Sequence, residues 1–127
     1  MEELVSYLTA KLAKDKGFIQ SVYNQKLLGF TPTHPEYINE ETNGIVSAPT
    51  QSLLCKWLRD IHNINIEIKT PDGKKGVWLY KIHKIHGVGD YSKQDFAYQN
   101  YEQALEAALE EALKLVIIPL PSLDAGN

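Results

Sequence analysis

The side chains in this sequence best suited to metal binding or catalysis are four histidines and one cysteine. His83 and His86 stand three residues apart, a spacing that sends side chains to opposite faces of a β-strand. A single strand would therefore not bring both imidazoles to one metal ion. Cys55 lies beside an apolar helical stripe, where a free thiol typically packs as a small hydrophobic group. These patterns predict no metal site and no cofactor.

The remaining polar residues show no arrangement typical of catalysis. His62 stands at the end of an expected helix, where an imidazole commonly caps backbone carbonyls, and His34 has no visible partner in the sequence. No close carboxylate pair occurs on one element, and there is no P-loop, dinucleotide fingerprint or zinc knuckle. We predict no catalytic residues, so a small enzyme is the least favoured of three function classes.

One segment, residues 64–86, has a composition that suggests nucleic-acid binding. Its lysines could neutralise phosphates, and its aromatic rings could stack on bases. The candidate residues are Lys69, Lys74, Lys75, Trp78, Tyr80, Lys81 and Lys84. Alternatively, Trp78 and Tyr80 face the core while the lysines protect an exposed hairpin from pairing with other chains. Burial of both rings under a helix would remove most of the support for nucleic-acid binding.

Composition and charge indicate a small globular protein. The chain has 127 residues, of which 43% are hydrophobic and 23% charged, values typical of one domain. The net charge of −3 conceals an asymmetry, because residues 64–93 have six lysines and three acidic residues, whereas 94–127 have one and six. A lone cysteine, an acidic start and the lack of any apolar run near ~20 residues predict a cytoplasmic protein without membrane contact.

Three segments have the apolar periodicity of amphipathic helices, namely residues 2–15, residues 48–62, and Tyr101 to about Val116 with Asn100 as the cap. The side chains expected on their buried stripes are Leu4, Val5, Leu8 and Leu12, then Leu54, Trp57, Leu58 and Ile61, then Tyr101, Ala104, Leu105, Ala108, Leu109, Ala112 and Leu113. Gly17 and Asn63 are expected to end the first two helices in the left-handed conformation.

Alternation of isoleucine with polar residues predicts a strand over residues 64–69, followed by a turn and a return strand over 77–85. Residues 96–98 could add a short third strand. Residues 18–30 fit either two strands or a short helix, and we favour the hairpin because Phe, Ile, Val and Tyr suit a pleated surface. Residues 31–46 show no period and are expected to form a long loop, either a binding loop or disordered.

This order of elements predicts an α+β fold with two layers, in which an antiparallel sheet made of hairpins is packed by about three helices. Residues 1–118 are expected to form a single domain, and residues 119–127 a flexible tail.

Four stretches of the chain also resemble a known family. They are residues 8–18, residues 47–66 (SAPTQSLLCKWLRDIHNINI), Trp78 to Ile82, and residues 101–115 (YEQALEAALEEALKL). Together they are similar to small uncharacterised proteins carried by phages, prophages and other mobile elements of gut-type anaerobic bacteria. The resemblance implies a mobile-element origin and a cytoplasmic setting, but it assigns no activity and no site residues.

The function class favoured by these observations is a non-enzymatic accessory protein of phage or prophage type that binds another protein. The absence of a catalytic constellation, the long segment 31–46 and the charge asymmetry support it. A nucleic-acid-binding module that uses residues 64–86 is the alternative, and a small enzyme comes third. Homo-oligomerisation through a strand edge or the alanine-rich last helix is compatible with the sequence.

Overall fold

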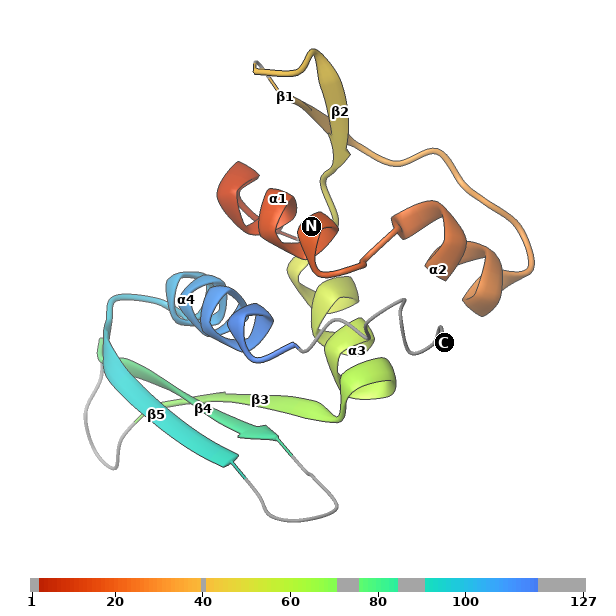
Figure 1. Cartoon of the computed structure of the whole chain (residues 1–127). Coiled ribbons are helices and arrows are strands. Elements are labelled where there is room, and N and C mark those ends of the chain that lie inside the picture. Colours follow the sequence, from red (N-terminus) through yellow and green to blue (C-terminus); the bar gives the residue numbers. More distant parts are fainter. Residues whose placement is uncertain (1–2, 40, 71–75, 85–90, 117–127) are drawn as a thin grey trace, which may run out of the picture.

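The computed structural model describes residues 3–39, 41–70, 76–84 and 91–116, with the side chains of residues 91–97 left out of the description. The elements along the chain are α1 (Tyr7–Asp15), α2 (Gln20–Leu28), β1 (Glu36–Asn39), β2 (Gly44–Ser47), α3 (Gln51–His62), β3 (Ile64–Lys69), β4 (Trp78–Lys84), β5 (Tyr91–Tyr98) and α4 (Tyr101–Lys114). Figure 1 shows their arrangement, with the three-stranded sheet on one side of the helices and the β1–β2 hairpin on the other.

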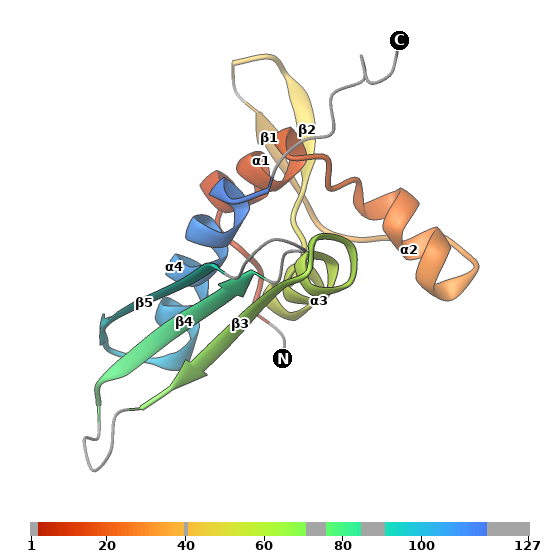
Figure 2. The ribbon, with the colours of Figure 1, turned by 60° about the horizontal axis from the view of Figure 1, so that its bottom comes forward.

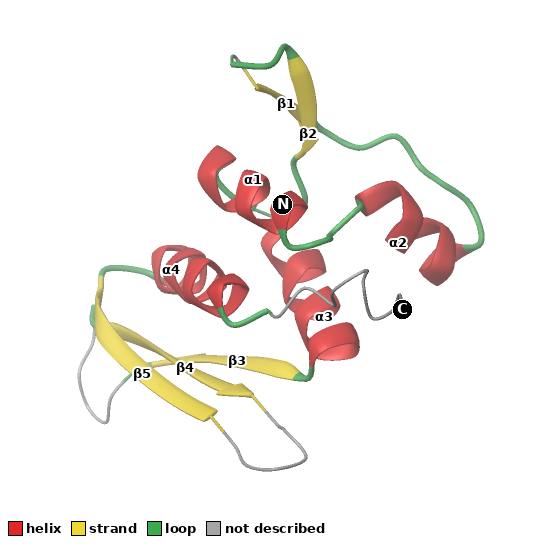
Figure 3. Ribbon diagram, in the orientation of Figure 1, coloured by secondary structure: helices red, strands yellow, loops and turns green. Residues whose placement is uncertain are grey.

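The main sheet has the strand order β3-β4-β5 and is antiparallel throughout. In the register of β3 with β4, Ile66 faces Ile82 and Ile68 faces Tyr80. These positions belong to the sheet face that packs against α4, and α3 packs beside α4 on the edge formed by β3 (Figures 2 and 3). The predicted two-layer α+β fold is therefore confirmed. The alternating isoleucines of β3 lie on the face that packs against the helices, as their spacing predicts.

Helix α4 forms the centre of the core because its apolar stripe contacts several elements. Its buried residues are Ala104, Leu105, Ala108, Leu109, Ala112 and Leu113, as the periodicity predicts. Tyr101, also expected on this stripe, is 44% exposed. Asn100 caps this helix by accepting a hydrogen bond from the Gln103 amide at 2.8 Å. Asn63, with a φ of 56°, ends α3 in the left-handed conformation as predicted. No helix within the described residues is both long and apolar enough to cross a bilayer.

The prediction of a hairpin over residues 18–30 is wrong, because α2 occupies most of this segment. Gly17 and Gly29 adopt positive φ angles on either side of the helix, which lets the chain turn in and out of it. The buried positions of α2 are Gln20, Tyr23 and Asn24, which have helical spacing. Two of these three are polar, so the helical period is invisible to a pattern search based on hydrophobicity.

The prediction of an unstructured loop over residues 31–46 is also wrong, since this segment forms most of the β1–β2 hairpin. Tyr37 pairs with Val46, which is buried, and Ile38 pairs with Ile45. Asn43 has a φ of 59° at the turn and donates its amide to the Asn39 carbonyl at 2.8 Å. The strands are only four residues long, too short to give a clear period between the flanking prolines and asparagines.

The first helix begins at Tyr7 and not at residue 2, and this changes which of its faces is buried. Ser6 is the N-cap, and its hydroxyl accepts a hydrogen bond from the Thr9 amide at 3.2 Å. The preceding residues are extended and attached to the start of α3, where Val5 donates to the Pro49 carbonyl at 2.9 Å. The buried residues of α1 are consequently Thr9, Ala10 and Ala13, whereas Leu8, predicted to be buried, is 69% exposed.

Candidate protein-interaction groove

A groove of about 540 Å³ lies between α1 and the β1–β2 hairpin. The residues that line it are Tyr7, Leu8, Lys11, Tyr37, Ile38 and Glu41. The rings of Tyr7 and Tyr37 meet edge to face, with centroids 5.9 Å apart and planes at 89°. The Tyr37 hydroxyl donates to the Val5 carbonyl at 2.6 Å, so this ring is held in place by both a hydrogen bond and an aromatic contact.

Two apolar side chains on opposite sides of this groove are exposed to solvent. Leu8 and Ile38 are each 69% exposed, more than any other large apolar residue that the structure describes. Burying such a side chain fully contributes about 1.5–3 kcal/mol, so both would gain from a partner's apolar surface. Lys11 and Glu41 connect the two walls through a 3.5 Å ion pair. The groove therefore combines a fixed aromatic pair, exposed apolar walls and a neutralised charge pair.

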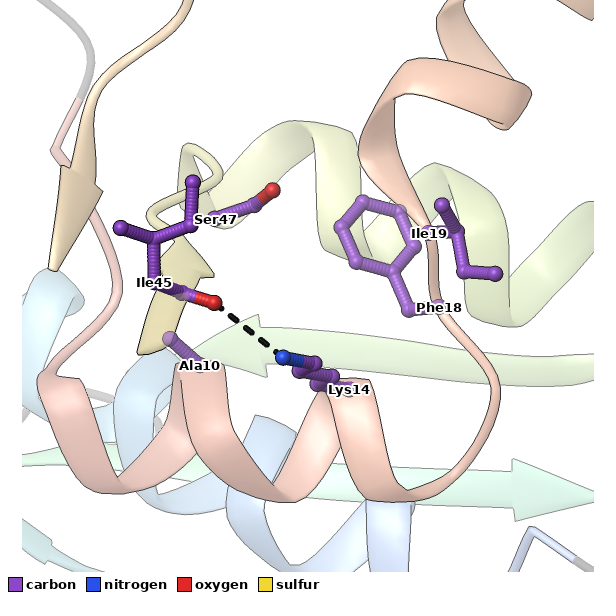
Figure 4. Close-up of a pocket in the computed structure, with 6 residues that line it drawn as sticks. All are labelled: Ala10, Lys14, Phe18, Ile19, Ile45 and Ser47. Carbon is purple, nitrogen blue, oxygen red and sulfur yellow. Dashed lines mark hydrogen bonds between the residues drawn. The ribbon is translucent and has the colours of Figure 1, made fainter. Parts of the chain in front are cut away.

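A second, smaller hollow lies between α1, the segment before α2, and β2 (Figure 4). Its volume of about 70 Å³ gives room for only a few water molecules. Lys14 donates from Nζ to the Ile45 carbonyl at 3.1 Å across this hollow, as the dashed line in Figure 4 shows. This hydrogen bond attaches β2 to α1. The hollow is too small for a ligand larger than a few water molecules.

A third depression, of about 590 Å³, shares Tyr37 with the first, since this residue lines both. It lies between the segment before α1 and the beginning of α4, and its acidic residues are Glu3, Glu102 and Glu106. Glu106 has a structural task, because its carboxylate accepts from the Ser6 amide at 2.9 Å and from Gln51 Nε2 at 3.1 Å. We call the first depression the apolar groove and this one the acidic groove.

Of the catalytic candidates from the sequence, Cys55 and His62 lie on α3, His83 lies on β4 and His34 lies before β1. The described contacts of these histidines do not involve Cys55. His62 packs edge-on against Trp57 with centroids 4.6 Å apart, and burial, together with Lys84, lowers its pKa. His83 Nε2 lies 3.6 Å from Glu67 on the neighbouring strand, while His86 lies outside the described residues. No group of three metal-ligating side chains occurs in the part of the chain that the structure describes.

One contact that the sequence did not indicate joins His34 to Ser47, with Nε2 3.1 Å from the hydroxyl. With the proton on Nδ1, the ring would donate to the Pro32 carbonyl at 3.4 Å and accept from Ser47. A serine beside a histidine acts as a nucleophile only where donors can also stabilise an oxyanion over a substrate-sized space. The adjacent hollow is the small one of about 70 Å³. The pair therefore holds the segment before β1 against β2.

We expect Cys55 to react slowly with alkylating reagents in the folded protein. Burial raises the pKa of its thiol to about 11, which outweighs the opposing effect of Arg59. At about pH 8 only about one thiol in a thousand would then be ionised, and the thiolate is the reactive form. The rate of iodoacetamide labelling at this pH should be about a hundredfold lower in the native protein than in urea. Equal rates in the two states would contradict the assignment of Cys55 as an inert, partly buried thiol.

The residues of the proposed nucleic-acid surface do not gather on one exposed face. Tyr80 is only 1% exposed and lies under α4, so its ring has no free face for a base. Trp78 is half-buried and packs edge-on against Tyr101 of α4 with centroids 5.8 Å apart. Lys84 donates to the Leu115 carbonyl at 2.8 Å, near the end of α4.

The other lysines of that set give little more support. Lys69 and Lys81 lie on the outer face of the sheet, where Glu67 is the register partner of Lys81. Lys74 and Lys75 fall outside the described residues. The structure therefore removes Tyr80 as a stacking residue and leaves Trp78 half-buried against α4, while Lys69 and Lys81 share the outer face of the sheet with the carboxylate of Glu67.

Helix α2 exposes several apolar side chains, but they do not form one surface. Val22, Leu27 and Leu28 are all exposed, and at 100° per residue they point in directions spread around the helix. Nothing in the described residues indicates what covers them. The apolar groove differs because Leu8 and Ile38 face the same hollow from two elements.

Comparison of the chain with protein-family models, curated proteins and solved structures gives no significant match. The resemblance to proteins of mobile elements therefore stays a prediction.

Proposed function

We propose that this chain is a non-enzymatic protein-binding domain that docks a partner in the apolar groove between α1 and the β1–β2 hairpin. The observation that supports it most is the pair of exposed apolar walls, Leu8 and Ile38, above the fixed rings of Tyr7 and Tyr37. Solvent-exposed apolar side chains facing one concave site are typical of protein interaction surfaces. The resemblance noted in the sequence supports an accessory role for a phage or prophage.

The separation of the titratable side chains supports a binding role over an enzymatic one. Cys55 is held as a neutral thiol, and each histidine contacts a different element from the others among the described residues. A binding domain needs only a surface whose shape fits a partner and whose burial by that partner lowers the free energy. The apolar groove meets this requirement with side chains already fixed by the fold.

The test is a selection of displayed random peptides on the immobilised full-length chain, followed by affinity measurements on three proteins. Leu8→Asp places a carboxylate in the first turn of α1, which is compatible with a helix, and removes one apolar wall. Val22→Asp is the matched control, since Val22 is 62% exposed in the first turn of α2 and lies outside the groove.

Selected peptides should bind Leu8→Asp about tenfold to a hundredfold more weakly than the wild type, because the apolar contact is lost. Their affinity for Val22→Asp should stay within about twofold of the wild-type value. Fluorescence anisotropy measures all three affinities. A selection that yields no peptide sensitive to Leu8→Asp would overturn the proposed function.

A further inference from the structure

Tyr37 lines both the apolar groove and the acidic groove, so the two depressions adjoin at this residue. We infer from this shared residue that they offer one joined surface, which runs from the hairpin, past the segment before α1, to the first turns of α4. A segment long enough to reach beyond Leu8 and Ile38 in that direction would meet Glu3 and Glu102. The chemistry of the second half therefore constrains what the first half can bind.

The charges on this joined surface are strongly one-sided. Among the described residues that line the two depressions, Lys11 is the basic one, and its ammonium group is already paired with Glu41. Glu3, Glu102 and Glu106 line the acidic groove, and no described cation forms an ion pair with their carboxylates. Three carboxylates that no described cation neutralises would repel an acidic partner and attract a basic one.

On this basis, and resting on the proposed function, we propose that the partner is a protein segment with lysine or arginine next to apolar side chains. The apolar residues occupy the groove between Leu8 and Ile38, and the cations lie against Glu3 and Glu102. Glu106 contributes its charge while it continues to hold Ser6 and Gln51. The apolar groove requires a partner with apolar side chains, which excludes a simple polyamine. The acidic groove disfavours a nucleic acid, because its phosphates would be repelled.

The proposal is tested with two synthetic peptides that share the same leucine spacing and differ only in charge, one with flanking lysines and the other with flanking glutamates. At low salt, the lysine peptide should bind the full-length protein about tenfold more tightly than the glutamate peptide. The double variant Glu3→Gln, Glu102→Gln should lose most of this preference. Glu67→Gln, on the outer face of the sheet, is the control for a change in charge away from the groove and should keep the preference.

The outcomes separate this proposal from the proposed function. If both peptides bind equally well and Leu8→Asp still weakens them, the charge preference is overturned while the binding role stands. If the glutamate peptide binds more tightly, the inference is likewise overturned. If neither peptide binds in a manner sensitive to Leu8→Asp, both proposals fail. Thermal melting of each variant ensures that a lost preference reflects the surface and not unfolding.

Discussion

Replacing Leu109 with alanine is expected to lower the free energy of unfolding by about 3 kcal/mol, within the range observed for leucine in close-packed cores. Leu109 is fully buried on the face of α4 that joins the main sheet to α1 and α3. The loss combines the transfer free energy of the removed carbons with the free-energy cost of the cavity that they leave. Urea unfolding followed by circular dichroism measures this change.

Leu8→Ala is the matched control for that experiment, because it makes the same chemical change in another helix at an exposed position. Its effect on the free energy of unfolding should stay within about 0.5 kcal/mol. A similar loss in the two variants would mean that Leu8 is buried. The apolar groove would then be filled by the protein's own side chains.

Trp57→Ala is the second variant with a large expected effect, and it should lower the free energy of unfolding by about 3–5 kcal/mol. Trp57 is buried on α3, and its indole meets Phe18 edge-on with centroids 5.2 Å apart. Phe18 in turn packs against Tyr23 of α2, with centroids 6.1 Å apart. The indole therefore supports α2 indirectly through Phe18, in addition to filling the core.

This attachment gives the Trp57 variant a local signature that Leu109→Ala lacks. Amides of α2 should exchange with deuterium faster in Trp57→Ala than expected from the loss of global stability alone. Trp57→Phe, which keeps an aromatic ring against Phe18, should restore most of the protection. Unchanged exchange in α2 would show that other contacts hold this helix.

The parts of the fold that the sequence predicts are those in which apolar spacing and burial coincide. The isoleucines of β3, which are buried or half-buried in alternation with exposed residues, and the buried stripe of α4 are examples. Asn63 and Asn100 show that helix ends are equally predictable when a side chain or a left-handed residue terminates the helix.

The parts of the fold that the sequence does not predict are those in which tertiary contacts override the local pattern. Gln20 and Asn24 are polar, yet they face inward from α2, so this helix lacks an apolar stripe. Val46 is fixed by its pairing with Tyr37 across a hairpin of very short strands. Neither arrangement leaves a periodic signal in the chain itself.

The apolar groove escaped prediction because Leu8 belongs to an apparent buried stripe. Leu4, Val5 and Leu8 have helical spacing, but Ser6 caps α1 and leaves the first two in an extended segment. The N-cap preference of Ser6 is the signal that could have revealed this, because a helix that starts at Tyr7 excludes Leu4 and Val5 from the apparent stripe, and Leu8 lies away from Ala10 and Ala13 on the helix. The acidic groove depends on the approach of residues about one hundred positions apart, such as Ser6 and Glu106, which no local pattern encodes.

The binding role of the groove is tested most directly by an amide chemical-shift map of the full-length protein titrated with a selected peptide. We expect the largest shifts at residues 7–11 and 36–41, with smaller ones at residues 3–6 and 102–106. Shifts concentrated instead on α2, or on the outer face of β3 and β4, would contradict the assignment of the apolar groove as the binding site.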